Sequence, residues 1–179
     1  QTQKETQQRI PLYQSWYPQV HVDFHEQGYN EPYYFAPAAE PLHDVLTPWQ
    51  KSFQDQIGKN HAKYFDANSW LYFTREVFDL FYPSYGDTWP TYNGAIGMTY
   101  EQAGHGRAGL GIQTDKGEVL TLKDRALHHM TTGISTVEIA SKNVEKFWFR
   151  KINDRFNSNH SVIYNCVDLK LYNQNVKPI

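Results

Sequence analysis

The sequence predicts an α/β fold, and three observations carry this prediction. Residues 19–28 alternate polar and apolar side chains as a strand does, two long segments carry helical patterns, and "GAIGMTYEQ" has the small and apolar residues of a second strand. We find no internal repeat and no low-complexity linker among the 179 residues. The chain is therefore expected to form one α/β unit, or part of one.

The first elements are a helix and a strand. Residues 1–19 are rich in helix formers, although Pro11 limits or kinks the predicted helix. The strand is predicted from about Gln19 to Phe24, within "HVDFHEQG". In an extended strand, the side chains of His21, Asp23 and His25 leave the same face. The following stretch, "YNEPYYFAPAAEP", has the proline, tyrosine and small residues of a loop held over a pocket.

A long helix is predicted over about 48–64. Thr47 is a suitable N-cap residue, and Pro48 follows at the first helical position. Trp49, Phe53 and Ile57 continue one apolar stripe. This helix should pack against the sheet.

The later segments alternate breaks with regular elements. A short strand is predicted at 68–73, a loop with two turns around 83–92, a central strand in "GAIGMTYEQ" and irregular backbone in "AGHGRAGLGI". A helix is predicted over 121–156, starting at the Thr121 to Asp124 capping arrangement, with Gly133 as its weak point. A strand or ordered tail is predicted from about 157. We expect one domain over 1–150, the extent of the family resemblance given below, and a C-terminal extension over 151–179.

Composition excludes several classes of function. The formal charge of −2 gives no reason to expect nucleic acid or an anionic membrane as partner. Cys166 is the single cysteine, so neither an intrachain disulfide nor a thiolate zinc cluster is expected. No stretch is long and apolar enough for a membrane span, and "QTQKETQQRI" does not have the pattern of a signal peptide. A chain that opens without Met is expected to be an excerpt from a longer protein.

His25 and Glu101 are the candidate residues for chemistry. A histidine on a strand is more often a hydrogen-bonded structural residue than a metal ligand, and this is the default interpretation for His21. Glu101 ends an apolar strand just before a glycine-rich loop, where open α/β sheets place catalytic groups. Asp23 could orient a neighbouring imidazole, but a buried structural hydrogen bond is its default role.

Known motifs of self-contained sites are absent from the sequence. It contains neither H-E-x-x-H nor H-x-x-E, so it cannot supply a complete zinc site of those types. It has no G-x-S-x-G, and Cys166 lies in a predicted strand without an exposed turn, so serine and cysteine nucleophiles are disfavoured.

Two stretches together resemble the second half of the catalytic domain of zinc-dependent metallocarboxypeptidases, the M14 peptidase family. They are "HVDFHEQG" and "YPSYGDTWPTYNGAIGMTYEQAGHGRAG", and the resemblance covers roughly residues 1–150. The matching positions are His25 at a strand end, Tyr82, Gly86 and Trp89 in a loop, Glu101 at a second strand end, and Gly106, Arg107 and Gly109 after it.

The resemblance implies a fold and a division of labour. The fold would be part of a three-layer α/β/α domain with a mixed central sheet. His25 would be a zinc ligand, Glu101 the general base and then the proton donor to the leaving amine, and Tyr82 a catalytic and substrate-binding residue that closes over the substrate. Arg107 would be structural. The parent protein would be a secreted or periplasmic carboxypeptidase that removes C-terminal residues from peptides.

The chain also departs from the family pattern. The H-x-x-E pair of zinc ligands and the arginines that bind substrate lie upstream in that family, and this chain lacks them. Alone it would hold zinc weakly and be inactive. We expect the C-terminal half of a larger peptidase, with a natural remnant as the alternative. Its expected partners are a peptide substrate and either the upstream half of the domain or a second copy.

Two other functions stay open at this point. A deacylase of the aspartoacylase and succinylglutamate desuccinylase type would use the same His and Glu on N-acyl amino acids. A non-catalytic module would bind peptide or glycan on the aromatic loops 29–37 and 82–92.

Overall fold

The computed structural model describes residues 3–16, 18–107 and 109–147. Its elements, in chain order, are α1 (Lys4–Trp16), β1 (Val20–Gln27), β2 (Tyr33–Tyr34), α2 (Pro48–Ala67), β3 (Tyr72–Phe73), α3 (Thr88–Tyr92), β4 (Ile96–Ala103), β5 (Gly111–Gln113), β6 (Val119–Thr121) and α4 (Leu122–Ser141). The predicted extension 151–179, with its strand from 157, lies outside the described residues.

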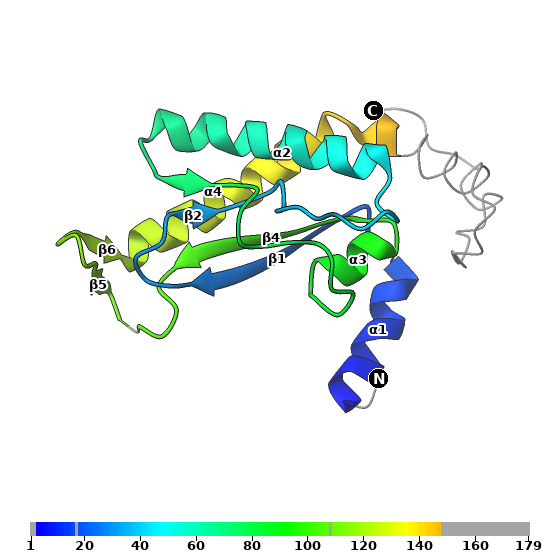
Figure 1. Cartoon of the computed structure of the whole chain (residues 1–179), viewed down its shortest axis with the longest axis horizontal. Helices are drawn as coiled ribbons and strands as arrows, with labels where there is room; N and C mark the ends of the chain where they lie inside the picture. Colours follow the sequence, from blue (N-terminus) through cyan, green and yellow to red (C-terminus); the bar gives the residue numbers. More distant parts are fainter. Residues whose placement is uncertain (1–2, 17, 108, 148–179) are drawn as a thin grey trace, which may run out of the picture.

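The fold is α/β with a mixed sheet, as predicted from the sequence (Figure 1). The strand order is β1-β4-β2-β3, and β4 lies between its parallel neighbour β1 and the antiparallel β2. Seven of the eight residues of β4 are buried. The expectation of a central strand in "GAIGMTYEQ" is confirmed.

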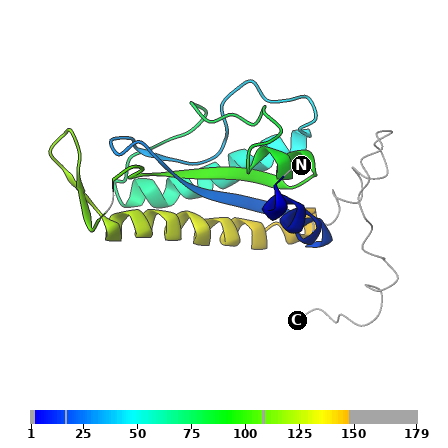
Figure 2. The same cartoon turned by 90° about the horizontal axis from the view of Figure 1, so that it is seen from below.

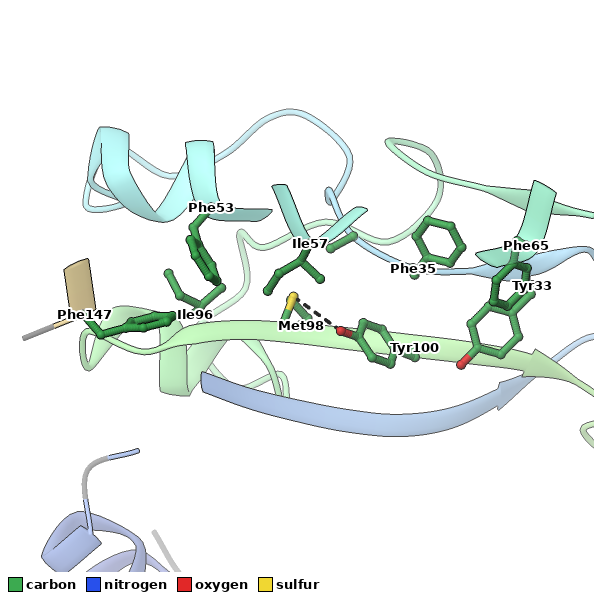
Figure 3. Close-up of a cluster of buried hydrophobic side chains, with 10 residues drawn as sticks. Tyr33, Phe35, Phe53, Ile57, Phe65, Ile96, Met98, Tyr100 and Phe147 are labelled. Atoms are coloured by element: carbon green, nitrogen blue, oxygen red, sulfur yellow. Dashed lines mark hydrogen bonds between the residues drawn. The ribbon is translucent and has the colours of Figure 1, made fainter. Parts of the chain in front are cut away.

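Helices α2 and α4 cover one face of the sheet, and loops with the short α3 cover the other (Figure 2). Side chains from α2 and from the sheet meet in one apolar core, which Figure 3 shows between the helix and β4. The buried members are Tyr33, Phe35, Ala36, Phe53, Ile57, Phe65, Ile96, Met98, Tyr100 and Phe147. Burial of this cluster fixes which face of β4 looks toward the helices, so alternate residues of β4 look toward the loops.

Both long helices begin with the predicted caps. Thr47 and Gln50 form a reciprocal capping box at the start of α2, and Thr121 and Asp124 form another at the start of α4. Each box satisfies two backbone N–H groups that a helix start leaves unpaired.

Some element boundaries differ from the sequence predictions. Helix α2 continues to Ala67, and β1 continues to Gln27. Helix α4 passes through Gly133 and ends at Ser141, residues 144–147 are helical again, and the part of the predicted helix from 148 to 156 lies outside the described residues. A Cβ atom at position 133 would lie 3.5 Å from the Phe24 ring, which is an ordinary contact.

The sequence predictions were least accurate for the short strands and the short helix. The predicted strand 68–73 narrows to β3, the predicted loop 83–92 contains α3, and β2 and β5 lie in segments expected to be irregular. Such short elements carry little periodic signal and are fixed by their neighbours.

A hairpin, β5–β6, projects beside the carboxyl ends of β1 and β4 (Figure 1). Asp115 at its tip accepts hydrogen bonds from the Tyr29 hydroxyl at 3.0 Å and from Asn30 Nδ2 at 2.6 Å. Arg125 of α4 donates to the Gly109 carbonyl at 2.6 Å. These contacts fix the loops that surround the ends of the two strands.

None of the described helices is both long enough and apolar enough to cross a membrane.

Candidate functional site

The pairing of β1 with β4 brings His25 and Glu101 together. The strands run parallel, and the register places His25 opposite Glu101. Paired residues of neighbouring strands project from the same face of a sheet, which here is the loop-covered face. His25 Nδ1 lies 3.8 Å from Glu101 Oε1. Two residues distant in sequence thus meet at the carboxyl edge of the sheet.

Glu101 is nearly inaccessible, whereas His25 is open. The Glu101 residue is 5 % exposed, and the His25 side chain is 54 % exposed. Burial raises the pKa of Glu101 to about 7, with Asp23 and Asp87 adding to the rise and His25 opposing it. A carboxyl group that titrates near neutral pH can both accept and donate a proton, which is the property of a general base.

Asp23 lies on the other side of the His25 ring. Its Oδ2 is 3.1 Å from His25 Nε2, because residues two apart on a strand share a face. His25 therefore has a carboxylate beside each ring nitrogen. The sequence analysis gave Asp23 a structural role by default, and the structure places it against the candidate ligand.

Asp87 is a site residue that the sequence analysis missed. It is 6 % exposed at the start of α3 and accepts hydrogen bonds from the Thr99 hydroxyl at 2.9 Å and the Thr88 hydroxyl at 3.2 Å. Burial raises the pKa of Asp87, and these hydrogen bonds oppose the rise. The sequence gave no clear signal for Asp87, because the segment was predicted as a loop and the Asp87 side chain makes no cap hydrogen bond to α3.

The Tyr82 loop stands outside this cluster. Tyr82 is 56 % exposed, and its ring meets Tyr85 edge-on with 5.3 Å between centroids. Within the described ranges it forms no hydrogen bond or ring contact with His25 or Glu101. Further along the loop, the backbone at Gly86 lies directly against Asp23. The loop is thus attached to the site at Gly86, and the Tyr82 side chain is exposed.

His129 supports the site from the helix face. This α4 side chain hydrogen bonds the Tyr33 hydroxyl at 2.7 Å and the backbone of His25, and its ring packs edge-on against Phe24. Burial lowers the pKa of His129. The sequence gave no sign of this contact, because only the α4 crossing brings it under β1.

Other candidates have structural positions. His21 packs edge-on against Tyr13, and burial lowers its pKa, which fits the default structural interpretation. The Arg107 guanidinium lies over the Tyr29 ring at 4.3 Å. This contact joins the loop after β4 to the segment after β1.

In the part of the chain that the structure describes, no three His, Cys, Asp or Glu side chains are arranged to hold a metal ion. His25 can offer one imidazole nitrogen, and zinc in proteins takes at least three protein ligands. The described residues could therefore supply one ligand of a zinc site, His25.

Searches with this chain found no matching family model, no matching curated protein and no matching solved structure.

Proposed function

We propose that the chain is the C-terminal half of the catalytic domain of a zinc metallocarboxypeptidase of the M14 type. The observation that carries this proposal is the pairing of His25 with Glu101, 3.8 Å apart at the carboxyl ends of adjacent parallel strands. The resemblance gives these two residues the roles of zinc ligand and general base. The mixed sheet would then be part of a three-layer α/β/α domain.

The proposed chemistry divides between His25 and Glu101. When bound, zinc supplies polarisation of the scissile carbonyl and acidifies the attacking water. His25 would hold it through a neutral ring nitrogen, with the remaining ligands from an upstream H-x-x-E. Glu101 would take a proton from the attacking water and pass it to the leaving amine. A pKa of about 7 suits both transfers near neutral pH.

Tyr82 is proposed to close over the substrate. Its side chain is exposed, and its loop is held at Gly86 beside Asp23. The resemblance gives it a hydrogen bond to the terminal carboxylate or to the scissile amide of a peptide. The same resemblance is the ground for proposing a secreted or periplasmic protein that acts on peptide C-termini.

The open side of β1 supports the proposed upstream half as partner. β1 is an end strand, and no other strand of the described residues pairs with its outer edge. Beside it α4 exposes Met130, Ile134 and Val137, which are 54 %, 62 % and 69 % exposed, and Phe24 is 47 % exposed. Open edges and contiguous apolar faces favour association with another strand and helix.

The test is hydrolysis by a longer protein that extends upstream to include an H-x-x-E. We expect stoichiometric zinc, hydrolysis of blocked dipeptides, and a loss of about 100-fold or more in kcat for Glu101→Gln. Glu26→Gln is the matched control, because Glu26 lies on the same strand as His25 but is exposed and faces Arg125 at 3.8 Å. A longer protein without zinc, or full activity with Gln at 101, would contradict the proposal.

The same assay distinguishes the alternatives. N-acyl amino acids, used as a second substrate set, would be hydrolysed faster than peptides by a deacylase. A binding module would bind peptide or glycan without metal. Much of the surface proposed for the binding module is not accessible, because Tyr33, Tyr34 and Phe35 of the aromatic loop are buried.

A further inference from the structure

We propose that a groove between α2 and β3 binds a small aromatic carboxylate. β3 is the end strand of the sheet opposite to β1, and the groove lies on the face that the helices cover. His25 and Glu101 look toward the loops on the other face. The groove therefore does not belong to the candidate site, and the inference is independent of the proposed zinc chemistry.

Two walls form the groove. Asp55, Lys59 and Ala62 of α2 line one wall, at spacings that place them on the same side of a helix. Tyr72 of β3 and Arg75 in the segment after it line the other wall. The cavity between them has a volume of about 210 Å³. Drug-sized ligands occupy roughly 300–1,000 Å³, so this groove fits a smaller molecule, such as one with a single ring.

The floor of the groove offers a surface for that ring. Phe35 lines it, and its ring is stacked on that of Tyr72 with 4.8 Å between centroids and 22° between planes. Phe35 is fully buried, whereas Tyr72 is only partly buried and keeps some of its surface accessible. A ligand ring placed against Tyr72 would extend this pair, because aromatic rings attract one another in offset-stacked and edge-on arrangements.

Contacts within the chain hold the two walls in position. Arg75 Nη2 donates a hydrogen bond to Asp55 Oδ1 at 2.6 Å, which joins the walls, and the Arg75 backbone N–H donates to the Pro37 carbonyl at 2.8 Å. A Cβ atom at Gly58 would come within 2.3 Å of the Ala36 carbonyl oxygen, so glycine allows α2 to lie directly on the segment after β2. A groove formed in advance binds its ligand without a large ordering cost.

The charge of the groove favours an anion. Its lining has two cations, Lys59 and Arg75, and one carboxylate, Asp55, which is paired with Arg75. Within the described residues, the exposed Lys59 forms no ion pair. Asp66 is hydrogen bonded with the Tyr72 hydroxyl and does not line the groove. A carboxylate could accept charge-assisted hydrogen bonds from Lys59 and from the remaining donors of Arg75.

An extended peptide added to the outer edge of β3 is the other class of occupant, and the structure disfavours it. β3 has two residues, and the chain then turns at Arg75 and Val77, whose φ values of 62° and 65° are left-handed. Such a short edge offers few ladder hydrogen bonds to an added strand. A neutral peptide therefore serves as the competing probe.

The experiment is a titration of the ¹⁵N-labelled 179-residue chain with phenylacetate at pH 7, followed in ¹H–¹⁵N correlation spectra. We expect saturable shifts of the amide signals of 58–62 and 72–75, with a Kd on the order of 1 mM, as for a ligand of about ten non-hydrogen atoms. 2-Phenylethanol has the ring without the charge, and acetate has the charge without the ring. Each should bind at least about five-fold more weakly than phenylacetate.

Three variants test the assignment to this groove. Lys59→Gln should weaken phenylacetate binding by about five-fold and leave 2-phenylethanol binding unchanged. Lys63→Gln is the matched control and should leave both unchanged, because Lys63 is also on α2 but does not line the groove. Ala62→Leu fills the groove and should abolish the shifts with both probes. Amide signals outside the groove report whether each variant is folded.

Three results would overturn the proposal: 2-phenylethanol binding as tightly as phenylacetate, equal phenylacetate affinity in Lys59→Gln and Lys63→Gln, or shifts that stay linear up to about 20 mM. Tighter binding of a blocked, uncharged tripeptide at the same amides would overturn it in favour of the peptide. The titration needs neither zinc nor an upstream segment. Its result and that of the hydrolysis test can therefore fail separately.

Discussion

His61 of α2 and Tyr100 of β4 are both completely buried, and His61 Nε2 forms a hydrogen bond of 2.8 Å with the Tyr100 hydroxyl. His61 Nδ1 forms a second hydrogen bond, at 2.7 Å, with the Ser135 hydroxyl of α4. One imidazole thus connects both helices to the central strand. Both ring nitrogens are hydrogen bonded to hydroxyl groups, and burial disfavours the charged ring, so His61 is held in the neutral form.

Acid should destabilise the chain through His61. Burial lowers its pKa from 6.5 to about 3. Below pH 6.5 the unfolded chain binds a proton that the folded chain does not, so stability is lost as pH falls from about 6.5 toward 3, by up to about 1.4 kcal/mol per pH unit. Urea unfolding of wild type and His61→Gln between pH 4.5 and 7.5 should show the smaller slope in the variant.

The matched control for His61 is His43→Gln, because His43 is exposed. This variant should retain the wild-type dependence of the free energy of unfolding on pH. If the free energy of unfolding depends on pH equally in His61→Gln and wild type, folding does not lower the pKa of His61, and the prediction is wrong.

Glu101 should have the opposite effect on stability. Its folded pKa of about 7 lies above the ordinary 4.5, so the folded chain holds the proton more tightly, and its contribution is present below about pH 4.5 and lost as pH rises toward 7. Relative to Glu101→Gln, the wild-type chain should lose on the order of 3 kcal/mol of unfolding free energy across this interval. Urea unfolding at pH 5 and 7.5 gives the difference. A difference between the two proteins that stays constant with pH contradicts the prediction.

Gly97→Ala should destabilise the packing of α3 on β4. A Cβ atom at 97 would overlap the Asp87 carbonyl oxygen and the Thr91 hydroxyl, and both groups are buried. We expect a loss of about 1–3 kcal/mol, as for other overpacked sites, measured by urea unfolding. Gly28→Ala should change the free energy of unfolding by less than about 0.5 kcal/mol. Equal values for the two variants would show that α3 moves away from the strand without cost.

The apolar side of α4 should make the isolated chain self-associate. Ile134→Lys and Val137→Lys place charges on this face and should reduce the concentration-dependent rise in sedimentation coefficient, with little effect on stability because both residues are exposed. Leu71→Lys is the control, since Leu71 is 69 % exposed beside β3, away from α4. A wild-type chain that stays monomeric at about 100 μM would contradict this prediction.

Much of the fold could be predicted from local signals. The caps at Thr47 and Thr121 and the alternation in β1 depend on residues close in sequence, and each predicted an element that the structure contains. The two-residue strand β2 and the short α3 could not be predicted, because they exist only where neighbouring segments satisfy their backbone groups, and β3 was predicted with bounds that were too long.

The candidate site could also be predicted only in part. His25 and Glu101 could be singled out as residues at strand ends, but their mutual register depends on how β1 and β4 pair. The approach of Gly86 to Asp23 and of His129 to the back of β1 depends on tertiary packing, for which the sequence has no periodic pattern.

The pairing of β1 with β4 also has a consequence for the order in which the chain folds. Every ladder partner of β1 lies beyond the whole segment 28–95, and the strand next to β1 in the chain, β2, pairs with β4 instead. Forming this pairing requires closure of a long loop, so β1 should join the sheet late, after α2 has packed on β4. During synthesis on the ribosome, His25 would have no partner strand until Glu101 has left the ribosome. The site would then form only when β1 pairs with β4.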